Sequence, residues 1–149
     1  MSHTTQHSTS SPAPSFAQAS VREAMHPGIL TSAPDATLVE IARTMAAHRV
    51  HCVAVMGIEE RHRPHLVWGI VSDLDVIRAA QDVDGELPSA GQIAATEPVT
   101  VDVDEPLTRA AQTMAEHDVH HLVVVEGQDP RPVGIISCLD LAAALADVR

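Results

Sequence analysis

Two short motifs carry the side chains best placed to do chemistry, and both pair a serine with an aspartate three residues later. They are GIVSDLD at residues 69–75 and GIISCLD at residues 134–140, and each predicts a buried strand that continues into a helix. The first turn of a helix offers unpaired N–H groups and a positive dipole end, which favour a phosphate. The serine adds a hydroxyl donor, and the aspartate can accept hydrogen bonds from two ribose hydroxyls. The candidate binding residues are Ser72, Asp73 and Asp75 in the first motif and Ser137, Cys138 and Asp140 in the second.

The same spacing also has a purely structural interpretation. A serine followed three residues later by an acid forms a capping box, in which each side chain bonds the backbone N–H of the other residue. A single Ser-x-x-Asp favours the cap. Here the motif occurs twice, each time after a glycine and an apolar pair. The recurrence favours ligand binding, with the cap as the alternative.

An internal repeat positions the two motifs. When the sequence is aligned with itself, Thr31–Val55 matches Thr100–Val124, and eleven of these twenty-five pairs are identical. The interval from Gly69 to Gly134, at the two motifs, is shorter than that from Thr31 to Thr100, so a loop of variable length is expected between the aligned segments. The chain therefore contains a duplicated unit of about 65 residues.

Each repeat predicts the element order β-α-β-β-α, and hence an α/β fold. Short extended segments are expected at residues 29–32 and 99–101, and closing helices at residues 73–81 and 138–147. Leucine, alanine and methionine recur at helical spacing from Leu38 and again from Leu107. Thr37 with Glu40 predicts a capping box for the first of these helices, and Pro106 is expected at the first position of the second. The apolar runs HCVAVM, LVWGIV, HLVVVE and PVGIIS predict strands that are buried on both faces.

The composition argues against several classes of function. The 149 residues carry a formal net charge of −11, so no nucleic-acid partner is expected. All nine basic residues are arginine, which removes the lysine of a phosphate-binding P-loop and Schiff-base chemistry. Phe16 and Trp68 are the only aromatic residues, too few to stack bases. Motifs of nucleophilic or zinc-dependent hydrolases are lacking as well, so no catalysis is expected.

The termini and the cysteines predict a soluble cytoplasmic protein. Residues 1–18 are expected to form a disordered tail, followed by repeat 1 at residues 19–83 and repeat 2 at residues 84–149. The N-terminal segment lacks the features of a signal peptide, and no apolar run approaches the ~20 residues of a membrane span. Cys52 and Cys138 are too few for a disulfide scaffold, and each is expected to be a small buried apolar residue.

The duplicated unit and its two Gly-apolar-apolar-Ser-x-x-Asp motifs resemble the tandem cystathionine-β-synthase (CBS) domain pair, or Bateman module. The resemblance covers about residues 20 to 149 and implies two repeats related by a pseudo-two-fold axis, here as a stand-alone module. It implies a regulatory protein without catalysis or cofactor, whose two clefts bind an adenosine ligand such as AMP, ADP or ATP. It also implies a homodimer that packs through its helices and acts on an unidentified protein.

The resemblance adds residues that would line the clefts, since in the family the first short strand and the start of the second flank the adenine. Carried over, these residues are Thr31, Ser32, Val50, His51 and Cys52 in repeat 1 and Thr100, Val101, Val119, His120 and His121 in repeat 2. Many nucleotide-binding members have an arginine after the second-strand histidine, where this chain has Cys52 and His121. A cysteine brings no positive charge and a histidine brings one only when protonated, so repeat 1 is expected to bind polyphosphates less well than repeat 2. AMP or a less charged adenosine ligand is favoured over ATP, and Arg22, Arg49 and Arg131 are candidate substitutes.

Three alternatives have weaker support. The chain could be a dimerisation or partner-docking module with vestigial clefts, or its clefts could take another adenosyl ligand such as S-adenosylmethionine. An enzyme is the second alternative, although no catalytic motif supports it. A metal site is the third, because His51, Cys52, His120 and His121 are zinc-type ligands. Neighbours on a strand point to opposite faces, so no metal site is expected.

Overall fold

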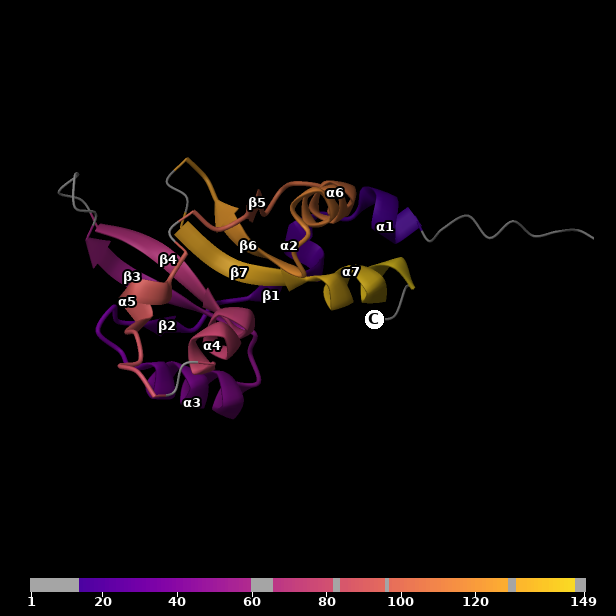
Figure 1. Cartoon of the computed structure of the whole chain (residues 1–149). Coiled ribbons are helices and arrows are strands. Elements are labelled where there is room, and N and C mark those ends of the chain that lie inside the picture. Colours follow the sequence, from indigo (N-terminus) through magenta and orange to yellow (C-terminus); the bar gives the residue numbers. More distant parts are fainter. Residues whose placement is uncertain (1–13, 60–65, 82–83, 96, 129–130, 147–149) are drawn as a thin grey trace, which may run out of the picture. The chain divides into compact units, whose positions relative to one another are not determined.

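The computed structural model in Figure 1 describes residues 14–59, 66–81, 84–95, 97–128 and 131–146. The chain divides into two compact units. The first, called the Asp75 unit here, comprises residues 28–99, and the second, the Asp140 unit, comprises residues up to Pro27 together with those from Thr100 onward. The segment that precedes repeat 1 in the sequence therefore belongs to the unit that contains repeat 2. Within the part of the chain described, no helix is long and apolar enough to cross a bilayer.

The Asp75 unit is a three-stranded sheet with helices packed against it. The sheet order is β2-β3-β4, with β2 parallel and β4 antiparallel to β3. Ile41 and Met45 of the first long helix pack with Val53, Val55 and Val71 of the sheet to form the core. The elements are β2 (Thr31–Ser32), α3 (Leu38–His48), β3 (Cys52–Glu59), β4 (Leu66–Ser72), α4 (Asp73–Ala80) and α5 (Ala90–Ile93).

The Asp140 unit repeats this arrangement and adds elements from the N-terminal segment. Its sheet order is β1-β7-β6-β5, in which β5 is parallel to β6 and the other neighbours are antiparallel. Leu107, Leu122 and Ile136 are fully buried in its core. The elements are α1 (Pro14–Gln18), α2 (Val21–Ala24), β1 (His26–Pro27), β5 (Thr100–Asp102), α6 (Leu107–His117), β6 (His121–Glu126), β7 (Arg131–Ser137) and α7 (Cys138–Leu145).

The predicted β-α-β-β-α order is confirmed in both units, and the helix starts follow the predicted signals in part. Thr37 and Glu40 form the capping box, with the Thr37 N–H donating to Glu40 Oε2 at 2.8 Å and the Glu40 N–H to Thr37 Oγ1 at 3.1 Å. Pro106 lies one position earlier than predicted: its ψ of 153° is extended, so it is the N-cap of α6 rather than its first residue. The closing helices end at Ala80 and Leu145, slightly before the predicted limits.

The segments that precede the two repeats are equivalent to each other in structure. In the Asp140 unit α2 is bonded to the turn before α6, and in the Asp75 unit α5 is bonded to the turn before α3. The matching bonds run from Val21 N–H to the Glu105 carbonyl (2.9 Å) and Arg22 N–H to Val103 (3.0 Å), and from Ala90 N–H to Ala36 (2.9 Å) and Gly91 N–H to Pro34 (2.8 Å). Matching partners are separated along the chain by the same interval as Thr31 and Thr100. The structural repeat therefore starts earlier than the sequence identity indicates.

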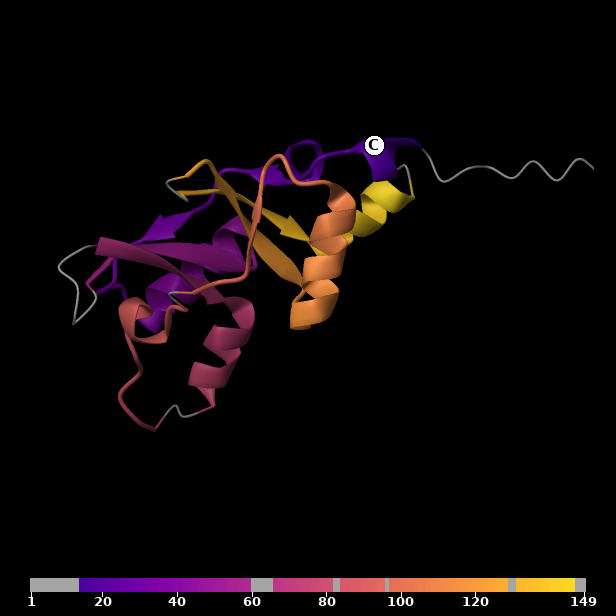
Figure 2. The ribbon, with the colours of Figure 1, turned by 90° about the horizontal axis from the view of Figure 1, so that it is seen from above.

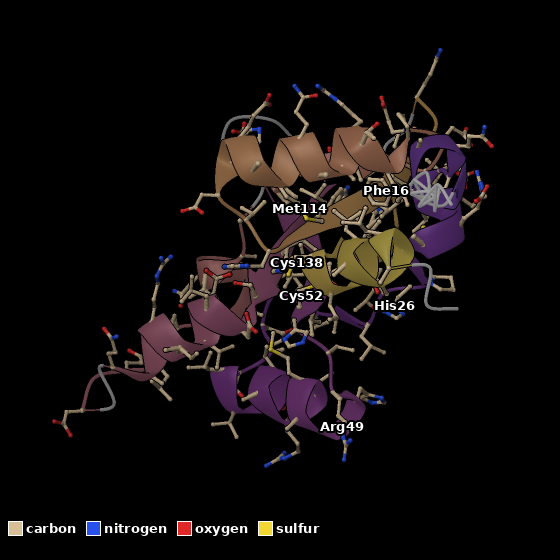
Figure 3. The ribbon with its side chains drawn as sticks, turned by 90° about the vertical axis from the view of Figure 1, so that its right-hand side faces the viewer. Phe16, His26, Arg49, Cys52, Met114 and Cys138 are labelled. Carbon is tan, nitrogen blue, oxygen red and sulfur yellow. The ribbon has the colours of Figure 1, made fainter. Side chains whose placement is uncertain are left out.

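The predicted disordered tail differs from the structure at residues 14–18. These residues form α1, which packs against α6 and α7 of the Asp140 unit (Figure 2). Phe16 on this helix is half-buried and gives the segment an apolar side chain to place against the unit (Figure 3). The rest of the predicted tail, residues 1–13, lies outside the described residues. The division of the chain at residues 83 and 84 remains a prediction.

Candidate functional site

Both Ser-x-x-Asp motifs form capping boxes at the starts of α4 and α7. The Ser72 N–H and Oγ lie 2.8 and 2.9 Å from Asp75 Oδ2, and the Asp75 N–H donates to Ser72 Oγ at 3.3 Å. The Ser137 N–H and Oγ lie 2.8 and 3.0 Å from Asp140 Oδ2, and the Asp140 N–H donates to Ser137 Oγ at 3.2 Å. The capping box, which is the alternative interpretation of the motif, is therefore formed in both units. It uses one oxygen of each carboxylate, and Oδ1 lies outside the box.

The predicted site residues of the second strands meet these helix starts. The Asp73 N–H donates to the His51 carbonyl at 2.8 Å, and the Cys138 N–H donates to the His120 carbonyl at the same distance. In the Asp75 unit the side chains also pair, with 2.9 Å between His51 Nδ1 and Asp73 Oδ2. Residues 50–52 thus lie beside residues 72–75, and residues 119–121 beside residues 137–140.

The short first strands lie in the same sheets, but further from the helix starts than Cys52 and His121 do. Thr31 and Ser32 are level with Ala54 and Val55, and Thr100 and Val101 are level with the equivalent residues of β6. They are two residues, about 7 Å, beyond the level of Cys52 and His121. Val101 is buried. Leu30, whose carbonyl accepts from the Ala54 N–H at 2.8 Å, lies one residue closer to the helix start and was not predicted.

The charges at the two helix starts differ. Asp73 and Asp75 both lie in the first turn of α4, whereas α7 has Cys138 in place of the first acid. Arg22, a candidate phosphate ligand, is 2.9 Å from Glu126 and 3.5 Å from Asp104, and the hydrogen bond to Glu126 raises its pKa. The α4 start therefore has the more negative surroundings.

His26 of β1 is a site residue that sequence reasoning missed. Its Nε2 lies 2.8 Å from Asp140 Oδ1, the oxygen left outside the capping box. The Asp140 side chain is only 11% exposed, whereas that of His26 is 76% exposed. His26 and Asp140 lie near opposite ends of the chain, so only the pairing of β1 with β7 brings the histidine next to α7 (Figure 3).

The two cysteines differ in burial, which the sequence did not indicate. Cys52 is buried as predicted, and burial together with the nearby Asp73 carboxylate raises the pKa of its thiol to about 12. The prediction that Cys138 is buried is wrong, because Cys138 is the first residue of α7, where its side chain and that of Leu139 are exposed.

We expect a thiol reagent at about pH 8 to react with Cys138 in the native protein and with Cys52 only after denaturation. The neutral, buried Cys52 thiol has neither the charge nor the access that the reaction needs. Counting reactive thiols before and after adding urea measures this difference, and Cys138→Ser is the control that should abolish the native reaction. Two rapidly reacting thiols in the native protein would contradict the burial of Cys52.

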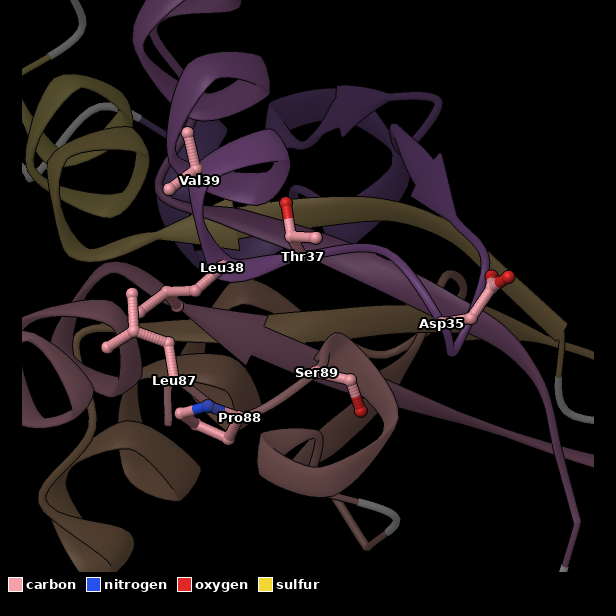
Figure 4. A pocket seen from close by; sticks show the side chains of 7 residues that line it. All are labelled: Asp35, Thr37, Leu38, Val39, Leu87, Pro88 and Ser89. Atoms are coloured by element: carbon pink, nitrogen blue, oxygen red, sulfur yellow. The ribbon is translucent and has the colours of Figure 1, made fainter. Parts of the chain in front are cut away.

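The structure has a hollow that none of these helix starts lines. The hollow, of about 350 Å³, opens in the Asp75 unit beside the start of α3, lined by Asp35, Thr37, Leu38, Val39, Leu87, Pro88 and Ser89 (Figure 4). None of the predicted site residues lines it. The described residues also contain no group of three or more His, Cys, Asp or Glu side chains placed to hold a metal ion. Residues 60–65 lie outside the described part of the chain.

The repeated sheets and capped helix starts define a tandem α/β module with one Ser-x-x-Asp junction in each unit. The family model of the CBS domain matches residues 21–82 and 90–147. The chain belongs to the CBS domain family.

Relatives and solved structures agree with this family. YhcV, a CBS domain-containing protein of Bacillus subtilis, is 30% identical over 125 residues, which cover 83% of each chain. The CBS domain protein PAE2072 from Pyrobaculum aerophilum, solved in complex with AMP, is 28% identical with a TM-score of 0.67 over 87% of this chain and 99% of that chain. The CBS domain pair of protein MJ0100, solved with 5′-methylthioadenosine and S-adenosyl-L-methionine, is 20% identical with a TM-score of 0.71 over 87% and 98%.

Proposed function

We propose that this protein is a regulatory module that binds an adenosine ligand at the starts of α4 and α7 and has no catalytic activity of its own. The observation that carries the proposal is the repeated junction, in which a strand ends in a serine that caps the next helix and the motif aspartate keeps one carboxylate oxygen outside the capping box. The carboxylate is suited to a ribose hydroxyl, and the helix start to a phosphate or another polar substituent.

The relatives support adenosine as the common part of the ligand. PAE2072 was solved with AMP, and MJ0100 with 5′-methylthioadenosine and S-adenosyl-L-methionine, all of which contain adenosine. The adenine would be held by the backbone of residues 50–52 and 119–121 and of the first strands, since a neutral base needs only apolar walls and backbone partners.

The charges of the sites favour a ligand with little negative charge. Asp73 and Asp75 both lie in the first turn of α4, and the chain carries a net charge of −11. Cys52 and His121 stand where, by the family resemblance, many nucleotide-binding members have an arginine. AMP is therefore proposed over ADP and ATP, and S-adenosylmethionine, with its positive sulfonium, is the alternative for the Asp75 unit. A cytoplasmic location is part of the proposal, because both cysteines are free thiols.

The closing helices support a homodimer. Leu74 and Ile77 on α4 and Leu139 and Leu145 on α7 are exposed apolar side chains that a second copy would cover. Light scattering at tens of micromolar is expected to give twice the mass of one chain. Leu139→Glu should lower that mass, whereas Val39→Glu on the exposed face of α3 should not. A monomer mass for the parent protein would contradict the dimer.

A thermal-shift panel tests the proposed function. AMP at about 100 times its Kd stabilises the folded protein by about 2.7 kcal/mol, which raises Tm by several degrees. The panel contains AMP, ADP, ATP, 5′-methylthioadenosine and S-adenosylmethionine, with GMP and ribose 5-phosphate as controls. AMP should also slow the labelling of Cys138, which lies at the α7 start. A module with vestigial clefts would show neither a shift nor protection with any adenosine compound.

A further inference from the structure

The two motif aspartates differ in what holds the oxygen outside the capping box. In the Asp140 unit, His26 Nε2 is 2.8 Å from Asp140 Oδ1, so both carboxylate oxygens are engaged. In the Asp75 unit, Asp75 bonds Ser72 through Oδ2, and the residue equivalent to His26 is an alanine, whose side chain cannot hold Oδ1 as the imidazole holds that of Asp140. The two otherwise matching sites are therefore unequal.

The sheet pairing identifies the residue that takes the place of His26 in the Asp75 unit. His26 is paired with Ile135, five residues before Asp140, and Ala95 forms an isolated bridge with Ile70, five residues before Asp75. His26 and Ala95 are separated by the same interval as the equivalent residues Thr31 and Thr100. An alanine has no side-chain donor, so this position leaves the Asp75 carboxylate open.

The backbone of His26 is held by strand pairing, whereas its ring is exposed. Gly134 lies directly against the His26 carbonyl, and a Cβ at that position would overlap this oxygen, so the glycine is what lets β1 approach β7. The imidazole itself is 76% exposed. A ligand can therefore displace the ring by a side-chain rotation, without breaking the strand pairing.

We propose that His26 is a positioning residue that occupies the ribose-accepting oxygen of Asp140 and so weakens the Asp140 site relative to the Asp75 site. This inference rests on the proposed function. A ribose hydroxyl that binds Asp140 must first replace the imidazole, whereas Asp75 accepts it directly. The ribose therefore favours the Asp75 site. By contrast, Cys52 and His121 predict that a polyphosphate favours the Asp140 site.

The test isolates each site and then exchanges the two residues. In an Asp75→Ala background, His26→Ala is expected to lower the Kd for AMP at the Asp140 site about two- to fivefold, because the contact between His26 and Asp140 no longer has to be broken. In an Asp140→Ala background, Ala95→His is expected to raise the Kd at the Asp75 site by a similar factor. His48→Ala, an exposed histidine at the end of α3, is the matched control and should change neither Kd.

The outcomes separate this inference from the proposed function. An unchanged or increased Kd in His26→Ala would overturn the inference, the increase because it would mean that His26 contacts the ligand itself. If neither single-site background nor the parent protein binds AMP, the proposed function fails and the inference with it. In the parent protein, the imidazole ¹⁵N signals of His26 should move on AMP binding and those of His48 should not. A His26 signal that stays fixed at saturation would show that the ring is not displaced.

Discussion

Asp75→Ala is expected to weaken AMP binding to the Asp75 unit about tenfold to a hundredfold. The carboxylate supplies charge-assisted hydrogen bonds to the ribose that are worth roughly 1.5–3 kcal/mol. Asp140→Ala should cause a smaller loss at its own site, because the parent protein spends part of that interaction on displacing His26. Calorimetric titration of AMP into each variant measures both effects.

The same substitution also removes an N-terminal cap, so a control must separate capping from binding. Asp75→Ala leaves the Ser72 N–H without its acceptor and should lower the free energy of unfolding by about 1 kcal/mol. Glu40→Ala breaks the equivalent box with Thr37 at the start of α3, away from the proposed site. It should cost similar stability and leave the Kd for AMP unchanged. If Asp75→Ala and Asp140→Ala behave like Glu40→Ala, both motifs are caps and nothing more.

Gly134→Ala is expected to lower the free energy of unfolding by about 1–3 kcal/mol, although it adds a single methyl group. The added Cβ would overlap the His26 carbonyl oxygen and approach Met25 Sδ to 3.3 Å. The backbone of β1 has to move to make room, which weakens the pairing of β1 with β7 and the placement of His26. Urea denaturation of the parent and the variant measures the loss.

A double variant identifies which neighbour causes the cost of Gly134→Ala. Met25→Ala removes the sulfur, but leaves the backbone oxygen of His26 where it is. The loss caused by Gly134→Ala should therefore persist in the Met25→Ala background. If the loss disappears there, the glycine would be needed only to accommodate a flexible side chain, and β1 would not depend on it.

The parts of the fold that are encoded locally could be predicted from the sequence. Helix α3 was predicted by the helical spacing of Leu38, Ile41 and Met45 and by the Thr37–Glu40 box. The recurrence of the apolar pattern predicted α6. In the sequence, Gly134 is only one position of the repeated Gly-apolar-apolar-Ser-x-x-Asp motif. Its physical reason, the close approach of β1, depends on a segment more than a hundred residues away.

The sequence could not predict that the segment before each repeat packs in the unit of the other repeat. Residues 20–26 and 89–95 have only Ser20 and Ser89 in common, and their equivalence is carried by backbone N–H and carbonyl groups that every residue type except proline supplies. For this reason the sequence does not reveal that His26 and Ala95 are equivalent, nor that the two sites are unequal. The register that pairs Thr31 and Ser32 with Ala54 and Val55 could not be predicted either, because a two-residue strand has no side-chain pattern that sets its register.

Calorimetric titration of the parent protein with AMP tests the central claim most directly. We expect saturable binding at two sites per chain and a weaker response to ATP. The double variant Asp75→Ala, Asp140→Ala lacks both carboxylates and, provided that circular dichroism shows it folded, should give heats close to those of dilution. Saturable binding of AMP to that double variant with an unchanged Kd, or no saturable heat from AMP, 5′-methylthioadenosine or S-adenosylmethionine with the parent protein, would contradict the account.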